Sequence, residues 1–191
     1  MKRKREIFVK YKRIIDMILA FSRILPKSFY LRVLKVIRGH DNYLAVFIRY
    51  ICLKNCAKKC GENVAIFSNV YLLNVGELTI GDNVSIHPLS YIDASGSIFI
   101  GSNVSIAHNT TILSEEHKYT NLNINIKDQG YIYKKTSIED NVWIGAGARI
   151  LAGCTVKTGS IIAAGAVVKK EVRSNAIVGG VPAKVLKERN S

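Results

Sequence analysis

Long apolar runs are what this 191-residue sequence most clearly lacks. A membrane-spanning helix needs about 20 predominantly apolar residues, whereas charges interrupt nearly every apolar run here well before that length. The one charge-free stretch that is long enough, residues 94–114, is excluded by its Ser, Asn and Thr content. The basic start KRKR lacks the continuous apolar stretch of a secretory signal. We therefore expect the protein to stay in the cytoplasm.

A zinc-type cysteine pattern is also missing. Cys52, Cys56 and Cys60 form no C-x2-C pair, and no histidine is close to them in sequence. They recur every fourth residue, so we expect them along one stripe of a helix as buried, reduced thiols. Cys154 has no visible partner. Unpaired cysteines agree with a reducing, intracellular compartment, and we expect no metal.

An aliphatic residue at every sixth position is what the sequence does have. A period of six fits neither a helix nor the plain alternation of a two-faced strand, so the chain must wind on itself with one inward anchor per short strand. Gly and Asn between the anchors suit tight corners. We expect a mainly β domain over residues 61–191, built as a parallel β-helix. The expected anchors are Ile80, Ile86, Ile92, Ile100, Ile106, Ile112, Ile138, Ile144, Ile150, Val156, Ile162 and Val168.

Acidic residues are scarce in the first third of the chain. Residues 1–60 hold 16 Lys and Arg but only 3 Asp and Glu, a net charge of +13. Apolar residues at helical spacing predict helices here, including 28–37 and 41–56, with Asp41 as a plausible N-cap. This basic segment could pack on the β-helix or on a neighbouring subunit. It could instead bind an anionic membrane face, where each Lys or Arg adds about 1 kcal/mol. Nucleic acid is disfavoured because the aromatics have core spacing.

The six-residue rhythm stops after Ile112 and resumes at Ile138. We expect residues 114–137 to form a long loop, and loops of this length in compact domains are usually functional. The loop carries His117 beside Glu115 and Glu116. A histidine poised by a carboxylate or a backbone carbonyl can act as a base near neutral pH. From the residues alone, a plain surface histidine is the other interpretation.

The block from Ser137 to Lys187 resembles the C-terminal half of the hexapeptide-repeat O-acetyltransferases, which include galactoside, maltose, capsule and exopolysaccharide enzymes. NVWIG, AAGAVV and GG-x-PAK occur in the family's order, and the resemblance covers roughly residues 61–189. It implies a left-handed β-helix, a homotrimer with active sites between subunits, acetyl-CoA as co-substrate and a carbohydrate acceptor. We therefore expect acetylation of a sugar hydroxyl, in a cell-surface polysaccharide or its precursor.

The resemblance also assigns roles to residues. His117 would be the general base, the N–H of Ala146 the oxyanion donor, and Trp143 would line the reaction region or else simply pack outward. Weaker candidates for holding the sugar are Asp93, Asn109, Glu116 and Tyr119. Small residues would let the pantetheine arm approach the backbone, and lysines that are otherwise merely solvated would bind the CoA phosphates. These are Gly145, Ala146, Ala163 and Ala164, and Lys169, Lys170, Lys184 and Lys187. Lys169 replaces the family's more usual threonine.

Other functions can be weighed against the same sequence. A γ-type carbonic anhydrase would need zinc-binding histidines that His87, His108 and His117 do not supply at the right spacing. A small soluble acceptor, such as a free sugar, an amino sugar nucleotide or serine, is the main alternative substrate. A non-catalytic β-helix scaffold is a further one. Residues 173–191 are expected to be a C-terminal tail, and residues 1–60 could hold the protein at the inner face of the membrane.

Overall fold

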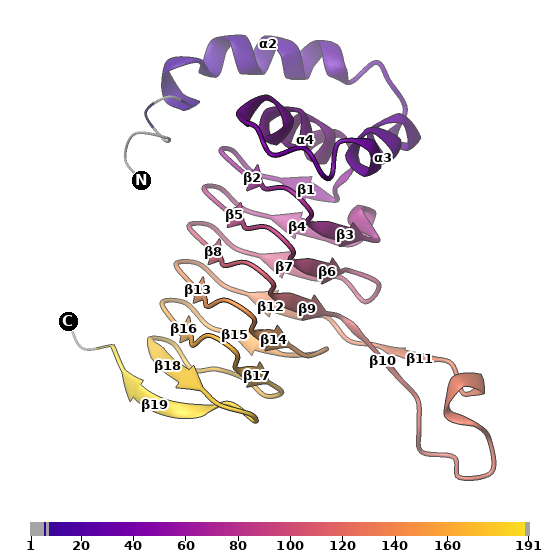
Figure 1. Ribbon diagram of the computed structural model, residues 1–191. Helices are drawn as coiled ribbons and strands as arrows, with labels where there is room; N and C mark the ends of the chain where they lie inside the picture. The colour runs from indigo at the N-terminus through magenta and orange to yellow at the C-terminus, as the bar shows by residue number, and fades with distance from the viewer. Residues whose placement is uncertain (1–5, 7, 190–191) are drawn as a thin grey trace.

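The structure, a computed structural model, describes residue 6 and residues 8–189. Short strands wind into stacked coils, and three helices lie across one end of the stack (Figure 1). These three are α2 (Lys12–Ser22), α3 (Lys27–Val36) and α4 (Tyr43–Cys56), and residues 8–10, just before α2, are also helical. None of the helices in the described part of the chain is long and apolar enough to span a membrane.

The coils form three parallel sheets, here called A, B and C, because each coil contributes one strand to each side. Sheet A contains β1 (Lys59–Cys60), β4 (Leu78–Ile80), β7 (Ile98–Ile100), β12 (Thr136–Ile138) and β15 (Thr155–Val156). Sheet B contains β2 (Ala65–Ile66), β5 (Ser85–Ile86), β8 (Ser105–Ile106), β13 (Trp143–Ile144), β16 (Ile161–Ile162) and β18 (Ala176–Gly179), with β19 (Lys184–Glu188) antiparallel at its edge. Sheet C contains β3 (Tyr71–Leu73), β6 (Tyr91–Asp93), β9 (Thr111–Leu113), β14 (Arg149–Ile150) and β17 (Val167–Val168).

The predicted anchors form the core. All twelve are at most 1% exposed, and they stack directly, as Ile86 does on Ile106 and Ile92 on Ile112. Burial of one such side chain contributes about 1.5–3 kcal/mol, so no single coil could hold its shape without its neighbours. The predicted parallel β-helix of hexapeptide repeats is confirmed.

Asparagines form a ladder along the corner between sheets A and B. Asn63, Asn83 and Asn103 all have φ between 54° and 58°, a left-handed conformation that asparagine tolerates better than most residues. The Asn63 amide donates to Asn83 at 3.0 Å, and Asn83 donates to Asn103 at 3.1 Å. One residue type thus satisfies the turn and links successive coils.

The helical layer departs from the sequence prediction at two residues. Asn42, not Asp41, caps α4, because the Asn42 side chain accepts a 2.8 Å hydrogen bond from the N–H of Ala45. Cys52 and Cys56 lie buried on α4 as expected, but Cys60 belongs to β1, because α4 ends at Cys56 and the chain turns into the first coil.

The interruption of the coils is a β-hairpin and not an irregular loop. Strand β10 (Glu115–His117) pairs antiparallel with β11 (Tyr131–Tyr133), and a short 3-10 turn, η2 (Ile126–Asp128), lies near the tip. A second such turn, η1 (Val75–Glu77), precedes β4. The coil resumes at Thr136, slightly before the expected boundary, and β18 and β19 lie within the expected C-terminal tail.

Candidate active site

His117 lies on the hairpin that leaves the β-helix between sheets C and A. Its exposed ring packs on Tyr131 with the ring centroids 4.5 Å apart, and the two residues are direct partners across the β10–β11 pair. Residues opposite one another in an antiparallel pair share a face, and Glu115 and Tyr133 are the next pair on that face. Among the described residues, His117 has no hydrogen-bond partner that would fix its tautomer.

Glu116 points to the opposite face of the hairpin, because side chains alternate along a strand. There it pairs with Lys134, and this hydrogen bond raises the pKa of the Lys134 ammonium. Within one chain Glu116 is therefore engaged away from His117. Glu115 is the carboxylate that shares the histidine's face.

Trp143, Gly145 and Ala146 lie elsewhere on the solenoid. Trp143 projects outward from sheet B and is 54% exposed, and Gly145 and Ala146 form the turn between β13 and β14 at the corner of sheets B and C. His117 extends from the corner of sheets C and A, and Figure 1 shows the hairpin projecting away on the side opposite to β13 and β16. One chain does not bring His117 and Ala146 together.

The turn at Ala146 presents a backbone donor. Gly147 has φ +70° and the N–H of Ala148 donates to the carbonyl of Gly145 at 3.3 Å, which makes residues 145–148 a type II turn. The N–H of Ala146 has no acceptor among the described residues. A Cβ on Gly145 would lie 2.6 Å from the nitrogen of Ala164, so only glycine allows these two coils to approach so closely.

Small residues continue along this corner. Ala163 and the exposed Ala164 occupy the same positions in the next coil, where Gly165 again has φ +70°. Without long side chains, the corner leaves the backbone accessible to an extended ligand. This arrangement fits the pantetheine arm of a coenzyme A thioester.

The four predicted phosphate-binding lysines are exposed and lie on two segments of the chain. Lys169 and Lys170 follow β17, where the chain passes from sheet C towards sheet A. Lys184 and Lys187 lie on β19, opposite Gly179 and Ile177 of sheet B. The N–H of Ala183 donates to the carbonyl of Val167 at 2.8 Å, so the segments that carry the two pairs run beside one another at this end of the chain.

The weaker sugar candidates are dispersed. Asp93 is 5% exposed, and its carboxylate accepts hydrogen bonds from Ser95 and Asn74, so it braces a corner. Asn109 is a corner residue with φ 56° whose carbonyl accepts from Arg149. Tyr119 is 62% exposed and borders a hollow near the hairpin tip.

Two residues of this region were not predicted from the sequence. Tyr131 supports the ring of His117, and the alternation in Tyr-Ile-Tyr was the signal for a strand that could have revealed it. Arg149 donates to the carbonyl of Gly147 at 2.8 Å and to that of Asn109 at 2.6 Å, which fixes the turn carrying Ala146. No sequence pattern marks the role of Arg149.

Comparison with known proteins agrees with this geometry. Residues 135–170 match the family model described as bacterial transferase hexapeptide (six repeats). A hexapeptide-repeat-containing acetyltransferase of Vibrio cholerae superposes with a TM-score of 0.76 at 25% identity, covering 86% of this chain and 91% of that one. This chain has the repeat and the fold of the hexapeptide-repeat acetyltransferases.

Two of these hexapeptide-repeat structures contain the thioester or its product. The Vibrio cholerae protein has also been solved with acetyl coenzyme A, at a TM-score of 0.75 and 25% identity, covering 86% of this chain and 87% of that one. A galactoside acetyltransferase in complex with coenzyme A has a TM-score of 0.75 at 26% identity, covering 90% of this chain and 82% of that one.

A curated relative matches a short segment of the chain. A 2,3,4,5-tetrahydropyridine-2,6-dicarboxylate N-acetyltransferase of Staphylococcus aureus is 55% identical over 51 residues. That segment is 27% of this chain and 21% of the relative.

Proposed function

We propose that this protein is an acetyl-CoA-dependent O-acetyltransferase that acts on a sugar hydroxyl. The sugar would belong to a cell-surface polysaccharide or to its precursor. The proposal rests on two features of this hexapeptide-repeat fold. One is the exposed histidine of the hairpin, His117, and the other is the N–H of Ala146, which has no acceptor among the described residues. The solved relatives with acetyl coenzyme A and coenzyme A support the co-substrate.

In the proposed reaction His117 accepts the proton of the acceptor hydroxyl as its oxygen attacks the thioester carbonyl. The N–H of Ala146 donates to the oxyanion that forms, a contribution worth about 2.7–4 kcal/mol in comparable sites. His117 then returns the proton to the departing sulfur of coenzyme A. Trp143 would cover the reacting groups from sheet B. No metal takes part in the proposed reaction.

A homotrimer would complete the site. His117 and Ala146 lie at different corners of one chain, so the base of one subunit would act beside the turn of its neighbour. The hairpin also exposes apolar side chains suited to an interface, including Leu122 at 96% and Ile126 at 57%. The pantetheine arm would lie along Gly145, Ala146, Ala163 and Ala164. Lysines from two chains, drawn from Lys169, Lys170, Lys184 and Lys187, would hold the phosphates.

The acceptor would enter between the hairpin face that carries His117 and the neighbouring coil, with Asn109 and Tyr119 as the remaining candidates for contacting it, because Asp93 and Glu116 are engaged elsewhere within the chain. The helical region 1–60, with its net charge of +13, supports a peripheral position at an anionic membrane face. Glycan precursors linked to lipid would be accessible there, and the enzyme would act from the cytoplasmic side.

The decisive experiment is release of free coenzyme A from acetyl-CoA across a panel of oligosaccharide, nucleotide-sugar and amino-acid acceptors. We expect release that depends on the acceptor and falls by about 100-fold or more in His117→Ala. Lys118→Ala, an exposed neighbour on the same hairpin, is the matched control and should retain activity. Equal rates for the natural chain and His117→Ala would remove the histidine from the mechanism.

A small amine acceptor is the second candidate, because the Staphylococcus aureus relative is an N-acetyltransferase. Its similarity covers only 27% of this chain and 21% of the relative. Amino sugar nucleotides and amino acids in the panel separate the two cases. Absence of both turnover and coenzyme A binding would favour the non-catalytic scaffold.

A further inference from the structure

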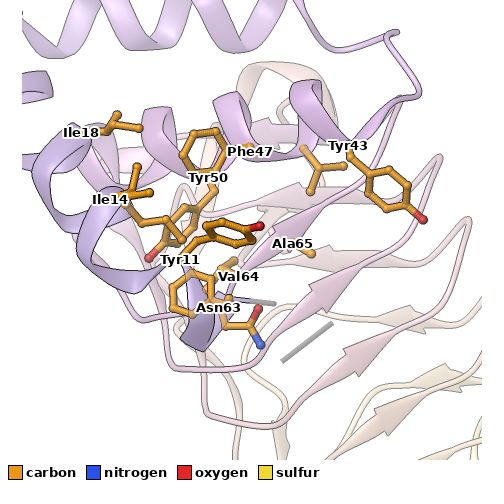
Figure 2. A pocket seen from close by; sticks show the side chains of 12 residues that line it. Tyr11, Ile14, Ile18, Tyr43, Phe47, Tyr50, Asn63, Val64 and Ala65 are labelled. Atoms are coloured by element: carbon orange, nitrogen blue, oxygen red, sulfur yellow. The ribbon is translucent and has the colours of Figure 1, made fainter. Parts of the chain in front are cut away.

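An apolar groove of about 530 Å³ lies between α2, α4 and the first coil (Figure 2). Ile14 and Ile18 line it from α2, Val46 and Phe47 from α4, and Val64 from the first coil, and Figure 2 shows Tyr11 reaching between them. The volume lies within the range of pockets that bind small ligands, about 300–1,000 Å³. The proposed reaction makes no use of this groove.

The apolar surface continues from Ile14, at the edge of the groove, onto the exposed side of α2. Ile14, Met17 and Phe21 are 51%, 55% and 68% exposed, and their spacing of three and four residues places them on one stripe of the helix. Ile15 is 7% exposed and faces the protein. A helix that only packs on a core needs one apolar face. The exposed stripe therefore points to a partner.

Cations lie near this stripe, Arg13 on α2 and Arg23 directly after its last residue, Ser22. Arg13 and Arg23 are exposed and form no ion pair with any residue that the structure describes. An exposed apolar stripe flanked by cations is typical of helices that lie in the interface of an anionic membrane. A second copy of this chain would bring another segment of net charge +13 against the first, and like charges disfavour that contact.

We propose that α2 binds an anionic phospholipid bilayer, with Met17 and Phe21 inserted among the lipids and one acyl chain in the groove behind the helix. Arg13 and Arg23 contact the lipid phosphates. The inference deepens the membrane position in the proposed function by naming the segment and the ligand. Membrane binding itself does not depend on the acetyl transfer.

Co-sedimentation with vesicles tests the surface. We expect the protein to bind vesicles of phosphatidylglycerol and phosphatidylcholine but not vesicles of phosphatidylcholine alone. Replacing Met17 and Phe21 by serine should lower binding by at least about 10-fold. Val36→Ser, at a residue 74% exposed at the end of α3, should leave it unchanged. Absence of binding to the anionic vesicles, or equal binding by the double variant, would overturn the proposal.

A short-chain phosphatidylglycerol below its micelle concentration tests the groove by calorimetry. The natural chain should bind it, whereas Val46→Trp, which fills the groove, should bind at least about 10-fold more weakly. Ile14→Trp, at a half-exposed position, gives the same block without altering α4. Glycerophosphoglycerol, which has no acyl chains, should not bind. Equal binding by folded forms of both tryptophan variants would exclude an acyl chain from the groove.

Two further measurements separate this proposal from others. Sedimentation without lipid should give the same mass for the natural chain and the Met17, Phe21 double variant; a smaller mass for the variant would make the stripe a subunit interface instead. Coenzyme A release on soluble acceptors should be the same in both. If release occurs while vesicle binding fails, only the membrane inference is wrong.

Discussion

The side chain of Arg49 supplies to Ile66 the hydrogen bond that a further coil would otherwise donate. Its Nε donates to the Ile66 carbonyl at 2.8 Å. In later coils a backbone N–H fills this place: that of Phe67 donates to Ile86, and that of His87 donates to Ile106. Strand β2 lies at the edge of sheet B, so no coil beyond it can supply the donor. The guanidinium of Arg49 therefore ends the hydrogen-bond ladder of this sheet.

Arg49 also joins the helices to this end of the coil. Its Nη1 donates to the carbonyls of Ile37 and His40 at 2.8 and 3.1 Å, and the residue is only 2% exposed. Burial lowers its pKa. Arg49→Met should lower the free energy of unfolding by about 3 kcal/mol, because several buried carbonyls lose their donor.

Urea unfolding measures this loss, and Arg32→Met is its control. Arg32 is exposed on α3, so its replacement should change stability by less than about 0.5 kcal/mol. Equal effects of the two substitutions would show that Arg49 does not seal the end of the sheet.

The close approach of Gly145 to the next coil gives a second prediction. Gly145→Ala should lower the free energy of unfolding by about 1–3 kcal/mol, because the added Cβ would meet the nitrogen of Ala164 at 2.6 Å and the coils would have to separate. At Gly76 nothing lies within 4 Å of an added Cβ. Gly76→Ala should therefore be neutral or slightly stabilising when the two variants are compared by urea unfolding.

The core could be predicted from the sequence because each coil repeats one local rule. Ile138 and Ile144 both point inward because each occupies the anchor position of a six-residue repeat, and that repeat is the whole structural unit of a coil side. The rule is interrupted after Val168, because the next buried valine, Val172, follows after four residues and not six, and Val178 then resumes the six-residue spacing. That shift hid β18 inside the expected tail.

Contacts between elements far apart in sequence could not be predicted. Arg49 reaches carbonyls at residues 37, 40 and 66, and no periodic pattern signals such contacts. The spacing of Cys52, Cys56 and Cys60 continued past the end of α4 by coincidence. For the candidate site, the sequence indicated which residues matter, but the separation of His117 from Ala146 follows only from the topology.

The buried thiols should be poorly reactive. Burial raises the pKa of the Cys52 thiol to about 11 and that of Cys56 to about 12, and it also raises that of Cys154. The thiolate is the nucleophile, so a raised pKa leaves little reactive form at pH 8, and the reactive fraction grows as the pH rises. Maleimide labelling of these three cysteines should be slow in the folded protein and rapid in urea. Rapid labelling of Cys56 in the folded state would contradict the packing of α4.

The proposed oxyanion donor, the N–H of Ala146, can be removed without disturbing its turn. In the corresponding turn between β5 and β6 the second residue is Pro88, followed by Leu89 at φ 64°. Ala146→Pro should therefore fold, because proline suits this position of a type II turn. It deletes the N–H, so acetyl transfer should fall by about 10²–10³-fold. Ala152→Pro is the control, because residues 151–154 form the same kind of turn at another corner, with φ 82° at Gly153.

Mixing two inactive variants tests whether the site lies between subunits. His117→Ala lacks the proposed base and Ala146→Pro lacks the proposed donor, so the proposed homotrimer of either variant should be nearly inactive. If the base of one chain acts beside the donor of another, co-refolded trimers of equal proportions should regain about a quarter of the natural coenzyme A release, because each site draws its two chains independently. If both groups act within one chain, every chain carries a defect and mixing restores nothing. Recovery at the expected level would establish the shared site; its absence, with both variants folded and trimeric, would mean that the hairpin bends back onto its own coils during catalysis.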